Sequence, residues 1–169
     1  MFRPVIELRD GTVVREFVER TWERFQNEKA RRKLREVFDY LVTADLPEQP
    51  IEVRLLLGFI ILENLKSTYA RCEGYPKKKD RYRDPESGKV LTFEELLVAM
   101  FGKQEMQVQL PDLIKWRNQM VHFGLSEDTR DNEMMAYEAM RSTIQEYLLR
   151  VIGYVGRYHH YRAMDYREM

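Results

Sequence analysis

The residues of this sequence that are best suited to chemistry lie between 112 and 124, where the chain reads DLIKWRNQMVHFG. Arg117, Asn118 and His122 stand there among apolar residues, and the spacing of those residues predicts a largely buried helix. On a helix, Asn118 and His122 lie one turn apart on the same face, and the long Arg117 side chain can reach the imidazole. A titratable imidazole, a permanent positive charge and an amide together suit acid–base chemistry on a phosphodiester.

Gly124 suits the position just past the end of this helix. His122 is therefore expected in the last turn, where the helix dipole favours the protonated imidazole. A second polar residue of interest is Glu63, which directly follows the apolar run at 55–62. It reads either as a carboxylate at the edge of the core, paired with a Lys or Arg, or as a supporting residue that orients Arg117 or His122.

A long polar segment at 74–90 reads GYPKKKDRYRDPESGKV, and its Gly, Pro and charge content predicts a surface loop. Basic and aromatic residues are interleaved there, a combination that suits phosphate contacts and base stacking. The simpler interpretation is a solvated, mobile loop without a binding role. The candidates for nucleic-acid contacts are Lys77, Lys78, Lys79, Arg81, Tyr82 and Arg83.

The segment LIKWRNQMVHFG, which runs through Arg117, Asn118 and His122, resembles the Arg-polar-x(3–5)-His signature of the HEPN superfamily. Its form WRNxxVHFG, together with the earlier apolar segment LLLGFIILENL, is most similar to the ApeA-type branch. The similarity is sharp over 112–124 and only topological over 50–161. Some members carry a Tyr, two residues after the His, that a nucleotidyltransferase modifies. This chain has Gly124 at that place, which argues against such a modification here.

The resemblance implies a metal-independent endoribonuclease of a defence or toxin–antitoxin system, with RNA as its substrate and no cofactor. His122 would handle the 2′-hydroxyl proton or protonate the leaving 5′-oxygen, and Arg117 would stabilise charge on the phosphate. Asn118 would orient His122 or bind a phosphate oxygen. One His per chain does not serve readily as both acid and base. The two-fold pairing of motif helices in this family implies a homodimer with the cleft at its interface, and an antitoxin or sensor protein as a further partner.

Two other hypotheses stay open. In the first, the chain is a non-catalytic HEPN-like module that binds RNA, a nucleotide or a partner protein, and Arg117 and His122 hold the ligand or brace the dimer. In the second, both side chains are structural parts of a helical bundle. An enzyme requires the two side chains to be accessible in a shared cleft beside the basic loop, whereas a structural role would seal them in hydrogen bonds to the core.

The composition fits one domain with a proper core, since the chain has 169 residues with 44% apolar and 33% charged content. The formal net charge is zero, so any RNA binding must rely on local patches. Cys72 is the single cysteine, which excludes an internal disulfide and predicts a plain structural or surface thiol. The start of the chain does not read as a signal segment and 55–62 is too short to span a membrane, so we expect a cytoplasmic protein with no membrane partner.

The predicted fold is all-α, an antiparallel bundle of five or six helices, and the N-terminus reads either as a helix start or as a short strand or hairpin. The domain at 1–169 would comprise an N-terminal helical extension at 1–45 and a core bundle at 50–161, separated at Pro47 and Pro50. Gly58 should lie where another helix approaches closely, and His159 and His160 read as a surface pair, or as part of a tail that contacts RNA or a second copy. Helices are expected near 12–33, 29–43, 51–71, 92–101, 111–123 and 129–157.

Overall fold

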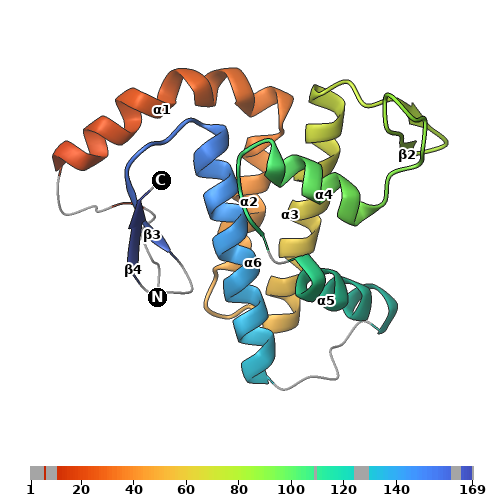
Figure 1. Cartoon of the computed structure of the whole chain (residues 1–169). Helices are drawn as coiled ribbons and strands as arrows, with labels where there is room; N and C mark the ends of the chain where they lie inside the picture. Colours follow the sequence, from red (N-terminus) through yellow and green to blue (C-terminus); the bar gives the residue numbers. More distant parts are fainter. Residues whose placement is uncertain (1–5, 7–10, 109, 124–129, 161–164, 169) are drawn as a thin grey trace.

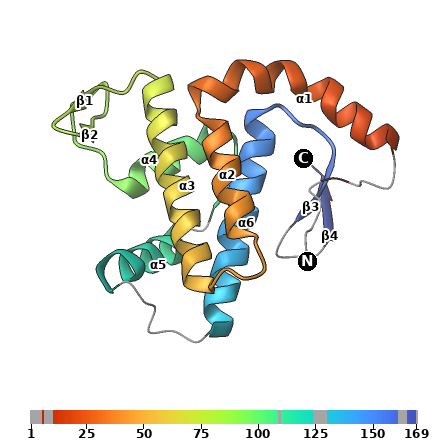
Figure 2. The same cartoon turned by 180° about the vertical axis from the view of Figure 1, so that it is seen from behind.

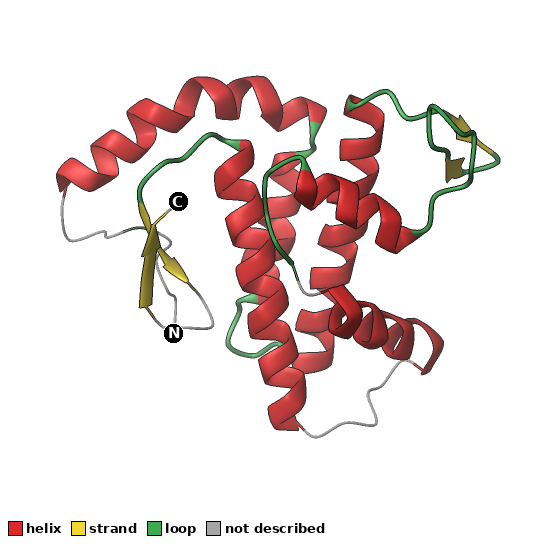
Figure 3. Ribbon diagram, viewed as in Figure 1, coloured by secondary structure: helices red, strands yellow, loops and turns green. Residues whose placement is uncertain are grey.

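The computed structural model describes residues 6, 11–108, 110–123, 130–160 and 165–168, and for 120–123 and 165–168 the description covers the main chain only. Six helices make up most of this part of the chain, in agreement with the predicted all-α bundle (Figure 3). In chain order they are α1 (Gly11–Arg31), α2 (Leu34–Ala44), α3 (Ile51–Cys72), α4 (Phe93–Gly102), α5 (Leu110–Phe123) and α6 (Arg130–Val151). Two antiparallel strand pairs complete it: β1 (Lys77–Lys78) with β2 (Arg81–Tyr82), and β3 (Arg157–His160) with β4 (Asp165–Glu168).

The helix α3 is the centre of the bundle, and α2, α4, α5 and α6 all pack against it. The chain descends in α2 and returns in α3, and α6 lies beside α3 and runs in the same direction (Figure 1). On α3, Gly58 allows the close approach that its position predicted. A Cβ at this residue would lie 2.1 Å from the terminal methyl carbon of the buried Met140 on α6. A larger residue here would force the buried Met140 side chain to shift, so the small residue suits the close packing of the two central helices.

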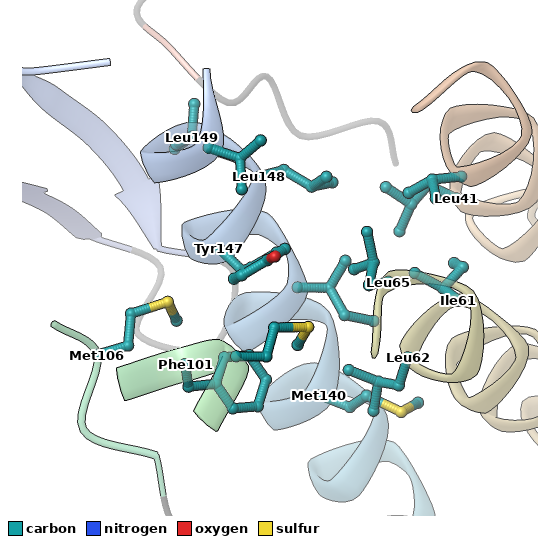
Figure 4. Close-up of a cluster of buried hydrophobic side chains, with 14 of the residues drawn as sticks. Leu41, Ile61, Leu62, Leu65, Phe101, Met106, Met140, Tyr147, Leu148 and Leu149 are labelled. Atoms are coloured by element: carbon teal, nitrogen blue, oxygen red, sulfur yellow. The ribbon is translucent and has the colours of Figure 1, made fainter. Parts of the chain in front are cut away.

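The core between α3, α4 and α6 is filled by aliphatic, Met and aromatic side chains (Figure 4). The rings of Phe101 on α4 and Tyr147 on α6 meet edge to face, with their centroids 5.8 Å apart. The short helix α2 adds Leu34, Val37, Leu41 and Ala44 to the same core. Residues on both sides of the predicted boundary near Pro47 and Pro50 thus share one hydrophobic interior.

In two of the loops between helices, the local conformation marks where the next helix begins. Lys33 adopts a left-handed conformation, with φ of 52°, between α1 and α2. At the start of α4, the main-chain N–H of Glu95 donates to the Thr92 hydroxyl at 3.1 Å, and the N–H of Thr92 donates to the Glu95 carboxylate at 2.8 Å. This is a capping box, and it fixes Phe93 as the first residue of α4.

The helix α1 arches over one end of the bundle (Figures 1 and 2) and packs less closely than its sequence predicts. Its apolar residues follow helical spacing, and Val14, Phe17 and Phe25 pack against the core. Val18 is nevertheless 47% exposed and Trp22 is 56% exposed. The polar Thr21 is the residue of α1 that is buried, and its hydroxyl donates to the carbonyl of Phe17.

The C-terminal region also differs from the sequence prediction. The last helix was expected to reach about residue 157, but α6 ends at Val151 and the chain turns into β3, which pairs with β4 beside α6 (Figure 1). The expectation of a surface histidine pair is wrong for His160, which is buried at 8% exposure. The Gln145 side-chain amide donates to the carbonyl of His159 at 2.6 Å and ties β3 to α6. The strand or hairpin predicted for the N-terminus falls mostly on residues outside the description.

Candidate functional site

The motif helix α5 begins at Leu110, and Pro111 lies in its first turn, as expected. Leu113 and Trp116 face the interior and are buried. The next two residues are more accessible: Arg117 is half-buried and Asn118 is exposed. The apolar side of α5 thus anchors the helix, and its polar residues are held at the molecular surface.

The guanidinium of Arg117 lies in a cluster formed by three helices. One terminal nitrogen donates to a Glu63 carboxylate oxygen on α3 at 3.0 Å, and the other donates to the Asn118 side-chain oxygen at 3.3 Å. Its central carbon lies 4.5 Å from the centroid of the Phe93 ring, which α4 presents from its first turn. Hydrogen bonds in two directions and a ring face fix the plane of this side chain.

The carboxylate of Glu63 contacts two cations. Its second oxygen accepts from the ammonium of Lys66, one turn along α3, at 2.5 Å. That ammonium lies 4.9 Å from the centroid of the Phe93 ring, so both cations lie against one aromatic side chain. Glu63 therefore pairs with a Lys and an Arg at the edge of the core, and it also contacts Arg117 as the supporting interpretation requires. Its role in a reaction stays a prediction.

Lys66 and Phe93 are members of this cluster that the sequence analysis did not select. The signal for Lys66 was its spacing of three residues from Glu63, which places both on one side of a helix. Phe93 gave no comparable signal, because its position follows from the packing of α4 on α3 and not from the local sequence. We refer to Glu63, Lys66, Phe93 and Arg117 as the α3–α5 cluster.

The remaining member of the predicted motif, His122, lies in the last turn of α5, one turn beyond Asn118 along the main chain. Its side chain lies outside the described residues, as does Gly124. The predicted proximity of the imidazole to Arg117 and Asn118 therefore stays a prediction.

The basic loop is a hairpin and not an irregular segment. Lys77 and Lys78 pair with Tyr82 and Arg81, and the two turn residues Lys79 and Asp80 both have positive φ, as a type I′ turn requires. The Tyr82 hydroxyl donates to the carbonyl of Ser67 on α3 at 3.0 Å. Because Ser67 follows Lys66, this bond fastens the hairpin to the same stretch of α3 that carries the cluster.

The six basic and aromatic candidates of the hairpin differ in what they contact. Arg83 donates to the carbonyl of Gly88, and Tyr82 uses its hydroxyl to hold α3, so both brace the loop. The Lys77 ammonium lies 5.7 Å from the centroid of the Tyr82 ring and pairs with Asp80 at the surface. The other three, Lys78, Lys79 and Arg81, are exposed, so this part of the loop has the positive charge that a phosphate backbone would require.

Two other charged networks in the bundle are more enclosed. In the first, Arg32 donates to the Glu28 carboxylate at 2.6 Å and to the hydroxyl of the fully buried Tyr147 at 3.1 Å. Burial raises the pKa of Tyr147 to about 12, so its hydroxyl keeps its proton at neutral pH. In the second network, the Asp45 carboxylate accepts from Tyr137 and from Arg141, which joins the end of α2 to α6.

Cys72 is half-buried with its sulfur 3.6 Å from the carbonyl oxygen of Arg31, as befits a structural thiol. In the described part of the chain, His, Cys, Asp and Glu do not gather in groups of three or more that could hold a metal ion. None of the described helices is long and apolar enough to cross a membrane.

Comparison of the chain with models of protein families, with curated proteins and with solved structures finds no match. The resemblance to the HEPN superfamily therefore rests on the motif carried by α5.

Proposed function

We propose that this protein is a metal-independent endoribonuclease of the HEPN type, acting on RNA in the cytoplasm as part of a defence or toxin–antitoxin system. The observation that carries the proposal is the placement of Arg117. This residue of the motif WRNQMVHFG is held by Glu63 and Phe93, yet its side chain keeps 28% of its surface exposed. Arg32, which donates to the buried Tyr147 hydroxyl, has only 9% of its side chain exposed.

In the proposed reaction, the 2′-hydroxyl of the RNA attacks the adjacent phosphorus and the bond to the 5′-oxygen breaks, which leaves a 2′,3′-cyclic phosphate. His122 takes the 2′-hydroxyl proton or protonates the leaving oxygen. Arg117 binds the phosphate through its planar fork and stabilises the charge that develops there. Asn118, which already contacts Arg117, orients His122 or binds a phosphate oxygen.

The proposal includes a homodimer, because one His122 per chain supplies either the acid or the base. A two-fold axis beside α5 would bring a second motif helix to the same phosphate. The exposed residues of the β1–β2 hairpin would then bind the RNA on either side of the cleavage site. An antitoxin or a sensor protein would control the activity in the cell.

The test is the incubation of purified protein with labelled single-stranded RNAs, including tRNA, in the presence of EDTA. We expect the wild type to cleave and to leave cyclic phosphate ends, and we expect His122→Ala to be inactive with its melting temperature nearly unchanged. His159→Ala removes an imidazole from β3, and cleavage like that of the wild type would assign the effect to His122 and argue against an RNA-contacting role for the tail. A large drop in the melting temperature of His122→Ala would indicate a structural role.

The second candidate is a module that binds RNA or a partner without cleaving, and one observation favours it. The guanidinium of Arg117 is already paired with Glu63 before any ligand arrives. Absence of cleavage by wild type and His122→Ala across several RNAs, with binding retained, would support this candidate over the enzyme.

A further inference from the structure

The α3–α5 cluster holds two positive charges against one negative charge. The Glu63 carboxylate gives one oxygen to Lys66 and the other to Arg117, at 2.5 and 3.0 Å. Within the described part of the chain, neither cation has a second carboxylate within ion-pair distance. The cluster therefore carries a surplus of one positive charge.

The two cations are held together at some cost, since like charges repel. The carboxylate between them and the quadrupole of the Phe93 ring offset that repulsion. Lys66 has only 12% of its side-chain surface exposed, and its ammonium contacts the Glu63 carboxylate and lies over the Phe93 ring, so part of the water around it is displaced. A partly dehydrated cation binds an incoming anion more strongly than a fully hydrated one, because less water remains to be displaced.

Among the three charged residues of the α3–α5 cluster, Glu63 has the most exposed side chain, at 39%. A carboxylate presents two oxygens to its partners, as the non-bridging oxygens of a phosphodiester do. It occupies the position between Lys66 and Arg117 that two such oxygens could take. Since its side chain reaches solvent, rotation away from the cations would leave both of them free for a ligand.

We infer that Lys66 and Arg117, held against Phe93, form a binding site for a phosphodiester of single-stranded nucleic acid, and that Glu63 is an internal anion that competes with the phosphate. This inference deepens the proposed function and rests on it for the choice of RNA as ligand. It adds Lys66 as a phosphate-binding residue and gives Glu63 the role of a competitor, in place of a support for the reaction.

The hairpin favours a strand of nucleic acid over a free phosphate as the ligand. The bond from Tyr82 to the carbonyl of Ser67 attaches the hairpin one residue after Lys66. Phosphates that follow the one bound in the cluster would then meet exposed cations, among them Lys78 and Arg81.

The probe for the test is a fluorescein-labelled single-stranded RNA with 2′-O-methyl groups, which cannot be cleaved through its 2′-oxygen. Its affinity is measured by fluorescence anisotropy at low salt, with thermal unfolding of each variant as a check on folding. Glu63→Gln should bind about threefold to tenfold more tightly than the wild type, because the competing charge is lost and the side chain keeps its size. Glu52→Gln, the same change on the same helix away from the cluster, should bind like the wild type.

Lys66→Gln should bind about threefold to tenfold more weakly. It should also lower the slope of log affinity against log salt by about 0.7, the value for one phosphate contact on a single strand. Lys29→Gln on α1 is the matched control for charge and should change the slope by less. The slope is measured on folded protein at each salt concentration, so it reports on the contact even where a variant is less stable.

Weaker or unchanged binding by Glu63→Gln would overturn the competitor role, and a Lys66→Gln variant indistinguishable from Lys29→Gln would overturn the phosphate site. These results are separate from cleavage. Tighter binding by Glu63→Gln without any cleavage of ordinary RNA would retain the site and reject the ribonuclease. Cleavage of RNA with no effect of Glu63→Gln or Lys66→Gln on binding would retain the ribonuclease and reject the site.

Discussion

Two arginine–glutamate pairs in this bundle use similar chemistry in different surroundings. Arg32 and Glu28 lie beside the buried Tyr147, with 9% and 15% of their side-chain surfaces exposed. Arg117 and Glu63 lie beside Phe93, with 28% and 39% exposed. Each carboxylate also contacts a second cation, Arg31 beside Glu28 and Lys66 beside Glu63. The two pairs therefore differ in exposure, and exposure distinguishes an internal brace from a candidate ligand site.

The largest effect expected from this comparison is on stability. Arg32→Met should lower the free energy of unfolding by about 3 kcal/mol, because it leaves the buried Tyr147 hydroxyl without its donor and the Glu28 carboxylate with only the exposed Arg31 as a partner. Urea denaturation measures this value. Arg20→Met is the control, since its pair with Glu16 is well exposed and should contribute less than about 1 kcal/mol. Equal losses in the two variants would contradict the assignment of Arg32 as a buried brace.

A smaller effect on stability is expected at the start of α4, which places the Phe93 ring beside the Arg117–Glu63 pair. Thr92→Ala removes the cap that fixes the turn carrying Phe93, and it should cost about 1 kcal/mol of stability. It should also weaken binding of the 2′-O-methyl RNA, because the ring that holds both cations becomes less well placed. The comparison is with Thr43→Ala, whose hydroxyl donates within α2 and has no capping role. Identical unfolding curves for the two variants would argue against the capping box as a support for the cluster.

The same cap predicts a modest dependence of stability on pH. The Lys89 ammonium, with further hydrogen bonds from Thr92, lowers the pKa of Glu95 to about 2 in the folded protein, from an ordinary value of 4.5. The stabilisation is therefore complete above about pH 4.5 and is lost as the pH falls towards 2. Melting temperatures recorded between pH 6 and pH 2 should fall less steeply for Glu95→Gln than for the wild type. Parallel curves would show that this carboxylate does not contribute to acid unfolding.

The smallest effect on stability is expected from the Arg117–Glu63 pair. Arg117→Gln should change the free energy of unfolding by less than about 0.5 kcal/mol, because the pair is partly solvated. The same variant should abolish RNA cleavage, which separates the site from the scaffold. Arg20→Gln should leave cleavage intact. A loss of stability in Arg117→Gln comparable to that of Arg32→Met would show that the two networks contribute equally to the free energy of unfolding.

Much of the fold could be predicted because its signals are local. The apolar run of α3, the Thr92–Glu95 capping box and the need for a small residue at Gly58 each depend on a few neighbouring positions. The C-terminal strands could not be predicted in the same way. Gly153 is a local signal for the end of α6, but the segment after it has no clear strand pattern. It becomes strand only through its pairing with β4 and its contact with Gln145.

The same distinction between local and tertiary signals applies to the candidate site. Arg117, Asn118 and Glu63 could be selected from sequence, since a motif or an unexpected polar residue marks each of them. Lys66 carried only the signal of its spacing from Glu63, and Phe93 carried none, because the cluster depends on how α3, α4 and α5 meet in space. Helical spacing also failed to separate Thr21, which is buried, from Trp22, which is exposed, since the two are adjacent on α1 and only tertiary packing decides between them.

The hairpin at 77–82 has a consequence for proteolysis. A segment with three consecutive lysines and two nearby arginines would be an early target for trypsin if it were unstructured. Here the strands are paired, the two turn residues are in left-handed conformations, and the Tyr82 hydroxyl binds α3. A protease must open such a segment before the chain fits its active site. Limited digestion should therefore leave this basic region intact at first, and the loss of that protection in Tyr82→Phe would show how much of it comes from a single hydrogen bond.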